Sequence, residues 1–121
     1  MAENVPLAYR ALTGTDPVAL WERVKEASSQ GYRLVGEVEC LQDLATNTST
    51  FLQLVVDPNR VKIKSSPFGV KETQVKTGDT SRDFCEEISD LIEREGWSLL
   101  APPKLFFFDA KPAIMQHLRR G

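Results

Sequence analysis

Very few side chains in this 121-residue chain have the type and spacing that catalysis or metal binding requires. A hydrolase would need a nucleophile, a base and an orienting group, but the only histidine, His117, lies close to the end of the sequence and is expected to be solvated. Cys40 and Cys85 have no partner at metal-ligand spacing, so we expect reduced thiols that fill the core. These residues predict no catalytic side chain, no metal site and no cofactor, and they make an enzyme the less favoured class.

Two Thr-Gly pairs stand where strands are expected to meet helices, and backbone N–H groups at such junctions can hold an anion. The pairs are Thr13-Gly14 and Thr77-Gly78. Neither belongs to a glycine-rich phosphate-binding motif, and Asp16 and Asp79 follow closely and would repel a phosphate. We therefore interpret both pairs as turns that lead into helices.

The net charge of −2 conceals a strong segregation of charge along the chain. Residues 1–59 carry 4 basic and 8 acidic side chains, and residues 77–109 carry 3 and 8. Residues 60–76 carry 5 basic side chains and 1 acidic one, while residues 110–121 carry 3 basic side chains and none that is acidic. Positive charge is thus concentrated in one internal segment and in the tail residues Lys111, Arg119 and Arg120.

The internal basic segment is a candidate partner-binding surface, formed by Arg60, Lys62, Lys64, Lys71 and Lys76. Such a surface suits a phosphate backbone or an acidic partner. The alternative is structural, because lysines on an edge strand prevent it from pairing with the edge of a neighbouring molecule.

Aromatic residues supply the remaining candidates for a binding site. In a strand containing Phe106-Phe107-Phe108, the middle ring points away from the other two, so Phe107 is expected to pack under a terminal helix or against a partner. A pocket between helices and sheet would be lined by Trp21, Tyr32 and Trp97, with His117 or Tyr9 as its polar group.

The sequence also contains an internal repeat, which bears directly on the fold. Thr13-Gly14 matches Thr77-Gly78, and Gly31-Tyr32 matches Gly96-Trp97 after an insertion of one residue. Between these anchors Leu20, Val24 and Ala27 correspond to Phe84, Ile88 and Leu91 at a constant shift of 64. We predict two repeats, at about residues 7–59 and 60–109, within a single domain of 1–121.

Helix signals are clear in both repeats. Asp16 before Pro17 is an N-cap followed by proline at the first helical position, Thr80 or Ser81 caps the second helix, and Gly31 and Gly96 end the two helices. Alternating apolar residues predict strands at 7–12, 32–40, 50–56, 60–64, 70–76, 97–101 and 104–108, and a terminal helix is expected at 112–119. Gly36 marks a bulge or a close contact.

These elements predict an α+β fold. We expect one two-layer domain, in which a mostly antiparallel sheet of six or seven strands carries two helices on one face with pseudo-two-fold symmetry. The alternative architecture has two small lobes joined by residues 60–76.

The N-terminal half resembles a small bacterial family known only as domain of unknown function number 1737. The residues that carry the resemblance are Tyr9, Leu12-Thr13-Gly14, Gly31-Tyr32, Gly36 and Phe51-Leu52-Gln53-Leu54-Val55. The likeness covers residues 7–56 well and 73–108 loosely, as a tandem duplication would. Tyr32 departs from the family's usual tryptophan, which Trp97 restores in the second copy. The resemblance implies a fold and no activity.

Three function classes follow from these observations. The leading hypothesis is a non-enzymatic accessory protein that binds another macromolecule, either a protein partner or a second copy of itself. The alternatives are nucleic-acid binding through residues 60–76, and a small-ligand binder or enzyme with a pocket between helix and sheet. The start of the chain has no signal-peptide pattern and no apolar run reaches about 20 residues, so we expect a cytoplasmic protein outside the membrane.

Overall fold

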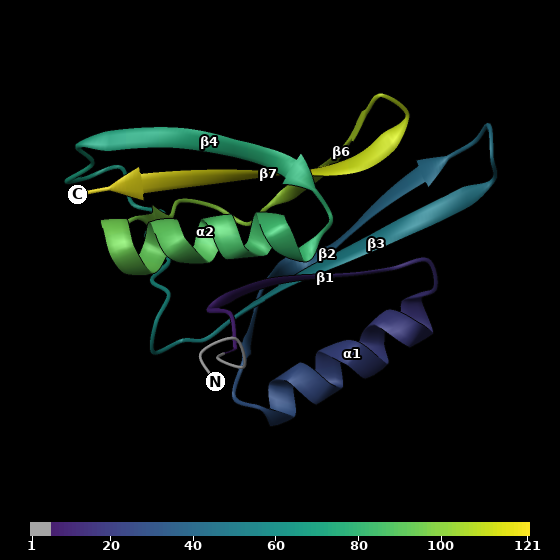
Figure 1. Cartoon of the computed structure of the whole chain (residues 1–121), viewed down its shortest axis with the longest axis horizontal. Helices are drawn as coiled ribbons and strands as arrows, with labels where there is room; N and C mark the ends of the chain where they lie inside the picture. The colour runs from purple at the N-terminus through teal and green to yellow at the C-terminus, as the bar shows by residue number, and fades with distance from the viewer. Residues whose placement is uncertain (1–5) are drawn as a thin grey trace.

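The computed structural model describes residues 6–121 and has an α+β fold with two helices and seven strands (Figure 1). The strands form two antiparallel sheets, so the predicted single sheet is wrong. The elements are β1 (Tyr9–Gly14), α1 (Pro17–Ser29), β2 (Arg33–Asp43), β3 (Thr48–Val56), β4 (Glu72–Asp79), α2 (Arg82–Glu95), β5 (Ser98–Leu99), β6 (Lys104–Phe108) and β7 (Lys111–Arg120).

The first sheet has the strand order β1-β3-β2, and its two faces bury different partners. Val55 on β3 packs with Leu20 and Val24 of α1 in one cluster. Its neighbours Leu52 and Leu54 belong to a second cluster, shared with α2 and the other sheet. Because successive side chains of a strand point to opposite faces, α1 covers one face of this sheet and the larger core covers the other. The expected arrangement of both helices on one face of a sheet is therefore wrong as well.

Local chemistry places α1 as the sequence predicts. The Asp16 side chain accepts a hydrogen bond of 2.9 Å from the Val18 backbone N–H, and Pro17 begins the helix. Gly31 follows the last turn with a φ of +95°, which a residue without a side chain adopts at least cost. At the second helix, Ser81 occupies the N-cap position and Gly96 ends the helix with a φ of +76°.

The second sheet has the order β4-β7-β5, and β6 also pairs with β7. The predicted helix at 112–119 is wrong, because these residues form the central strand β7. Ile114, Gln116 and Leu118 are each 0% exposed, at alternating positions. This period of two buries one face of a strand, and partner strands on both sides outweigh the local preference for helix.

The predicted strand at 60–64 is also wrong. Only an isolated bridge between Ile63 and Leu99 forms there, with hydrogen bonds from Leu99 N–H to the Lys62 carbonyl (3.0 Å) and from Lys64 N–H to the Leu99 carbonyl (2.8 Å). Val61 is buried, but Ile63 is 46% exposed.

A buried helix face joins the two sheets. In Figure 1, α2 lies between β1 of the first sheet and β4 of the second. Along the open edge of β1, the Tyr9 N–H donates to Ser89 Oγ (3.1 Å) and the Ala11 N–H donates to Cys85 Sγ (3.3 Å). Side chains one helical turn apart thus provide hydrogen-bond acceptors for an edge strand that has no further strand beside it in this sheet.

The two sheets also meet at Gly36, where the register of β2 and β3 shifts between Val35 and Glu39. Gly36 has a φ of +73°, and a Cβ at this position would lie 2.7 Å from Pro102 Cβ. The expected bulge and the expected close contact therefore both occur at this residue.

Each central strand contains a buried glutamine with similar bonding. Gln53 Nε2 on β3 donates to the carbonyls of Val35 (3.1 Å), Gly36 (3.2 Å) and Leu54 (3.0 Å). Gln116 Nε2 on β7 donates to the carbonyls of Ala101 (2.6 Å) and His117 (3.0 Å). Both glutamines satisfy backbone carbonyls at an irregular part of the neighbouring chain.

Candidate functional site

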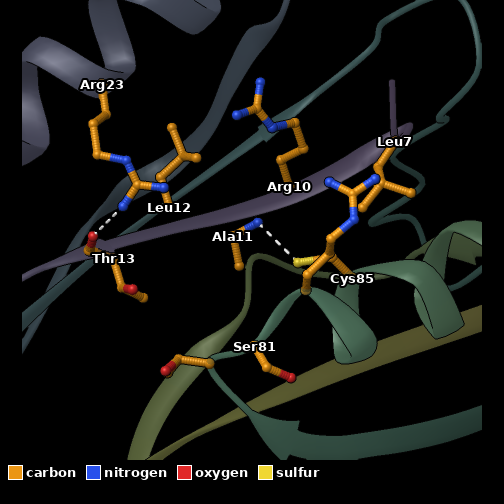
Figure 2. A pocket seen from close by; sticks show the side chains of 10 residues that line it. Leu7, Arg10, Ala11, Leu12, Thr13, Arg23, Ser81 and Cys85 are labelled. Carbon is orange, nitrogen blue, oxygen red and sulfur yellow. Dashed lines mark hydrogen bonds between the residues drawn. The ribbon is translucent and has the colours of Figure 1, made fainter. Parts of the chain in front are cut away.

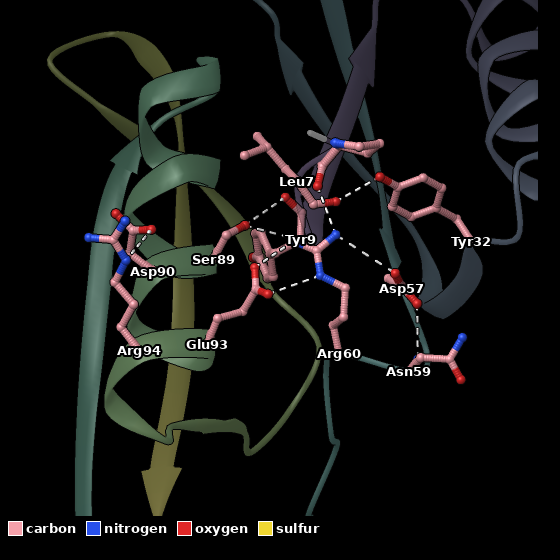
Figure 3. Close-up of polar contacts among 11 residues, drawn as sticks. Leu7, Tyr9, Tyr32, Asp57, Asn59, Arg60, Ser89, Asp90, Glu93 and Arg94 are labelled. Carbon is pink, nitrogen blue, oxygen red and sulfur yellow. Dashed lines mark hydrogen bonds and ion pairs between the residues drawn. The ribbon is translucent and has the colours of Figure 1, made fainter. Parts of the chain in front are cut away.

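Arg60, the first residue of the basic segment, is engaged within the molecule (Figure 3). Its Nε and Nη2 donate to the Glu93 carboxylate of α2 at 3.0 and 2.6 Å, and its Nη1 donates to the Pro6 carbonyl at 2.8 Å. The hydrogen bonds to Glu93 raise the pKa of Arg60 despite the opposing effect of partial burial. Arg60 therefore links the turn at residues 57–60 to α2.

The other basic-segment residues fall into two groups. Lys76 forms an ion pair with Glu87 at 2.8 Å. Lys62, Lys64 and Lys71 are exposed and have no ion pair with any residue in the range 6–121. The open positive charge of the segment is thus three lysines rather than five basic side chains.

Arg119, counted with the basic tail, is buried at 2% exposure. Its guanidinium donates to the backbone carbonyls of Lys64 (3.3 Å), Ser66, Phe68 (2.9 Å) and Gly121 (3.2 Å). Its Nε lacks a hydrogen-bond partner within the described part of the chain. Arg119 thus anchors the loop between Lys64 and Phe68 to β7 and offers no charge to a partner.

The three aromatic pocket candidates lie in different surroundings. Trp97 is buried beneath the Arg120 guanidinium, whose Cζ lies 4.6 Å from the ring centroid. Tyr32 is buried beside α1, and its hydroxyl donates to the Leu7 carbonyl at 2.7 Å. Trp21 is 55% exposed. Trp97 and Tyr32 belong to different core clusters, so the side chains do not line one common pocket.

The polar groups suggested for that pocket are placed differently as well. Tyr9 is fully buried and its hydroxyl donates to Gln116 Oε1 at 2.7 Å, while desolvation raises the pKa of the phenol. His117 is partly buried on β7. Cys85 is buried as expected, but Cys40 is exposed on β2, so its predicted place in the core is wrong.

Phe107 is 41% exposed on β6, next to Phe108 at 65%. Phe106 and Phe108 line an open hollow of about 400 Å³ together with Gly78 and Pro112. The hairpin of β6 and β7 that carries these rings projects from the sheet in Figure 1. Phe107 lies on β7's partner strand and not under a terminal helix, because no helix forms there.

An exposed apolar area surrounds Trp21, and we call it the Trp21 surface: Pro17, Val18, Trp21 and Val38. Val18 is 68% exposed and Val38 is 50% exposed. Pro17, Trp21 and Val38 line a hollow of about 60 Å³, and the buried side chains of Leu20 and Val24 also line it.

A further cavity, which the sequence did not suggest, lies between β1 and the start of α2 (Figure 2). It measures about 160 Å³. Arg10 of β1, Arg23 of α1 and Arg82 of α2 line it together with the hydroxyl residues Thr13, Thr80 and Ser81 and with Cys85. We call it the arginine cavity.

The contacts of the three arginines leave donor groups free. Arg23 Nη1 donates to the Thr13 carbonyl at 2.5 Å, and Arg82 Nε donates to Glu86 at 3.0 Å. Arg10 lies over the Tyr32 ring, with Cζ 5.1 Å from the centroid, and its Nη1 donates to Gln30 Oε1 at 3.5 Å. Each guanidinium has five N–H donors, so most remain available.

The charges of two arginines at this cavity affect the pKa of the Cys85 thiol. Burial raises the pKa of its thiol, while the hydrogen bond from Ala11 and the positive charges of Arg10 and Arg82 act in the opposite direction. The thiol is therefore protonated at neutral pH and serves as an acceptor for β1 rather than as a nucleophile.

Sequence reasoning missed the arginine cavity because its arginines come from three separate elements. Arg82 lies within an acidic stretch, where it looked like part of a solvated helix face. The nearest signal was the Thr13-Gly14 junction, which was interpreted as a plain turn although Thr13 lines the cavity.

Comparison with known proteins gives a family match in the N-terminal part of the chain. Residues 7–57 match the sequence model of the family described as Domain of unknown function (DUF1737). This range spans β1, α1, β2 and β3, which together form the first sheet and its helix. No curated protein and no solved structure matches the chain. None of the helices in the described part of the chain is long and apolar enough to cross a membrane.

Proposed function

We propose that this protein is a non-enzymatic binding protein that docks a macromolecular partner, itself a protein, on the Trp21 surface. The observation that carries the proposal is the exposed Trp21 ring beside an apolar hollow formed with Val38. Tryptophan is the residue type most enriched among the side chains that dominate interface affinity. A clustered set of exposed apolar side chains, unlike scattered single ones, is typical of an interaction site.

We also propose that the two halves are copies of one βαββ unit, in which β5 and β6 of the second half together take the place of β2. Both sheets place the strand before the helix next to the last strand of the unit, and both helices follow a Thr-Gly pair. The pairing registers support this: Leu12 lies opposite Gln53, and Lys76 lies opposite Gln116. A shift of 64 therefore relates the first strands of the units, and a shift of 63 relates their central glutamines.

The duplication gives the Trp21 surface a specific interpretation. At the shift of 64, Trp21 corresponds to Cys85 and Lys25 corresponds to Ser89. In α2 these positions contact the open edge of β1. In α1 the same positions are exposed. The face of α1 that includes Trp21 is thus the counterpart of a face already used to dock a strand edge, and a protein with an exposed strand edge is the partner that fits.

Acidic residues next to this surface define the partner further. Asp16, Glu22 and Glu37 adjoin Pro17, Trp21 and Val38 in the sequence. A partner that places an apolar side chain in the hollow and basic side chains around it is therefore favoured. The chain itself has such a basic segment, so a second copy is the first partner to test.

Light scattering over a concentration series tests this proposal with the full-length chain. We expect concentration-dependent dimers for the wild type and a dimer Kd weakened about thirty-fold in Trp21→Ser, since a central tryptophan contributes about 2 kcal/mol or more. Leu44→Ser is the matched control, because Leu44 is 82% exposed but lies between β2 and β3, outside both the Trp21 surface and the basic segment. A monomeric wild type at every concentration contradicts docking of a second copy, and an unchanged Kd in Trp21→Ser removes the Trp21 surface.

Nucleic-acid binding through the basic segment is a second candidate, supported by the exposed lysines Lys62, Lys64 and Lys71. We expect a gel shift at low salt that is lost in the Lys62→Glu/Lys64→Glu variant, because the contacts would be to phosphates and depend on charge. The control is Arg94→Glu, a basic residue on α2 whose side chain is 80% exposed. The absence of any shift with single- and double-stranded probes at low salt contradicts this candidate.

A further inference from the structure

Three arginines from separate parts of the fold line the arginine cavity. Arg10 comes from β1, Arg23 from α1 and Arg82 from the first turn of α2. Figure 2 shows Arg10 and Arg23 on one side of β1 and Cys85 and Ser81 on the other. No carboxylate is found among the ten residues that line the cavity.

The positive charge there is only partly balanced within the protein. Arg82 pairs with Glu86 on the next turn of α2. Neither Arg10 nor Arg23 forms an ion pair with a carboxylate of residues 6–121. Like charges placed around one small space repel each other, and a bound anion offsets that repulsion because it attracts each of them.

The carboxylate of Asp79 lies beside the hydroxyl residues of the cavity and has partners of its own. Asp79 accepts hydrogen bonds from the backbone N–H and the hydroxyl of Ser81, which lower its pKa. Asp79 lines the hollow beside β6 rather than the arginine cavity. The cavity lining itself thus contains no carboxylate, although Asp79 is bound to the lining residue Ser81 and its negative charge opposes that of a phosphate.

The size and donor chemistry of the cavity define the ligand class. A water molecule in the liquid takes up roughly 30 Å³, so about 160 Å³ accommodates a tetrahedral oxyanion with a few waters. Guanidinium groups bind phosphate oxygens in a bidentate way, and the hydroxyls of Thr13 and Thr80 add neutral donors, whereas the Ser81 hydroxyl already donates to Asp79.

We propose that the arginine cavity binds a phosphate group, either inorganic phosphate or the terminal phosphate of a phosphomonoester. Arg10 and Arg23 provide the uncompensated charge, and Arg82 adds donors from the start of α2. Because the three arginines belong to β1, α1 and α2, the bound group connects the first sheet and its helix to the second helix. This site is separate from the Trp21 surface, so either proposal can fail without the other.

Isothermal titration calorimetry and amide NMR of the full-length protein test the proposal, with inorganic phosphate as the first probe and a simple alkyl phosphomonoester as the second. We expect saturable binding, with the largest amide shifts at residues 10–13 and 80–85. Arg10→Gln and Arg23→Gln should each weaken the Kd at least tenfold, because each removes a charged donor. Arg94→Gln is the matched control, since Arg94 is an exposed α2 arginine away from the cavity.

The affinities of the two probes distinguish the two sources of the phosphate group. Tighter binding of the phosphomonoester identifies a phosphorylated ligand, and equal or tighter binding of inorganic phosphate identifies the free ion. Shifts that chloride reproduces at equal ionic strength, or a Kd unchanged in folded Arg10→Gln and Arg23→Gln proteins, overturn the proposal. Arg23→Lys, which keeps the charge but loses the bidentate geometry, should bind with intermediate affinity if a guanidinium contact is made.

Discussion

Replacing Arg119 by alanine is expected to destabilise the protein by about 3 kcal/mol. The buried guanidinium donates to four backbone carbonyls, three of them in the loop from Lys64 to Phe68. Alanine has no donor, and a buried carbonyl left without a partner costs roughly 1–3 kcal/mol. Part of that cost is recovered because the loop can move and admit water. Urea denaturation measures the change in free energy of unfolding.

Arg120→Ala is the control for this prediction. Arg120 forms a half-exposed ion pair with Glu72 at 2.8 Å and lies over the Trp97 ring. Exposed pairs of this kind contribute about 1 kcal/mol or less, so a smaller loss is expected. Hydrogen exchange should also accelerate around Ser66 in Arg119→Ala but not in Arg120→Ala. Equal effects of the two substitutions would show that the buried donors do not hold the loop.

Gly36→Ala is expected to cost about 3 kcal/mol, the second large effect. A φ of +73° strains any side chain by about 1–2 kcal/mol. The new Cβ would also lie 2.7 Å from Pro102 Cβ, on a segment joining two strands of the other sheet, so one backbone must shift. Thermal and urea unfolding provide the measurement.

Gly31→Ala measures the backbone strain without the close contact. Gly31 has a comparable φ of +95°, but a Cβ there would meet no atom within 4 Å. We expect a loss of about 1 kcal/mol, which reflects the backbone conformation alone. If the two alanine variants were equally stable, the close approach of Gly36 and Pro102 would contribute nothing to the packing of the two sheets.

Features set by neighbouring residues could be predicted from the sequence. Asp16 and Pro17 begin α1, Gly96 ends α2, and β6 has the predicted bounds, because each depends on local backbone geometry. The close contact of Gly36 was also anticipated, since a glycine in a strand indicates either a bulge or a near neighbour.

Features set by distant partners could not be predicted. β7 has residues compatible with a helix, and only its pairing with β4, β5 and β6 makes it a strand. The prediction of a single sheet was wrong for a related reason. The strands form two shorter sheets whose apolar side chains share one core cluster with α2.

In the candidate sites, too, the residue types could be read from the sequence, but their partners in space could not. Charge counting identified Arg60 and Arg119 as basic, but the partners that engage them come from α2 and from a loop more than fifty residues away in the sequence. The arginine cavity combines residues 10, 23 and 82, and no spacing rule links positions so far apart. Trp21 was predicted to line a pocket with Tyr32 and Trp97, and its exposure became visible only in the structure.

The contacts of Ser89 and Cys85 with β1 have a consequence for any attempt to produce the family-matching region, residues 7–57, by itself. Such a fragment would lack α2, and the amides of Tyr9 and Ala11 would then point into solvent along an unprotected strand. Uncovered strands of this kind recruit identical neighbours and promote aggregation. Shortened versions of this protein should therefore retain the segment through Glu95, or carry a lysine or proline on β1 in its place.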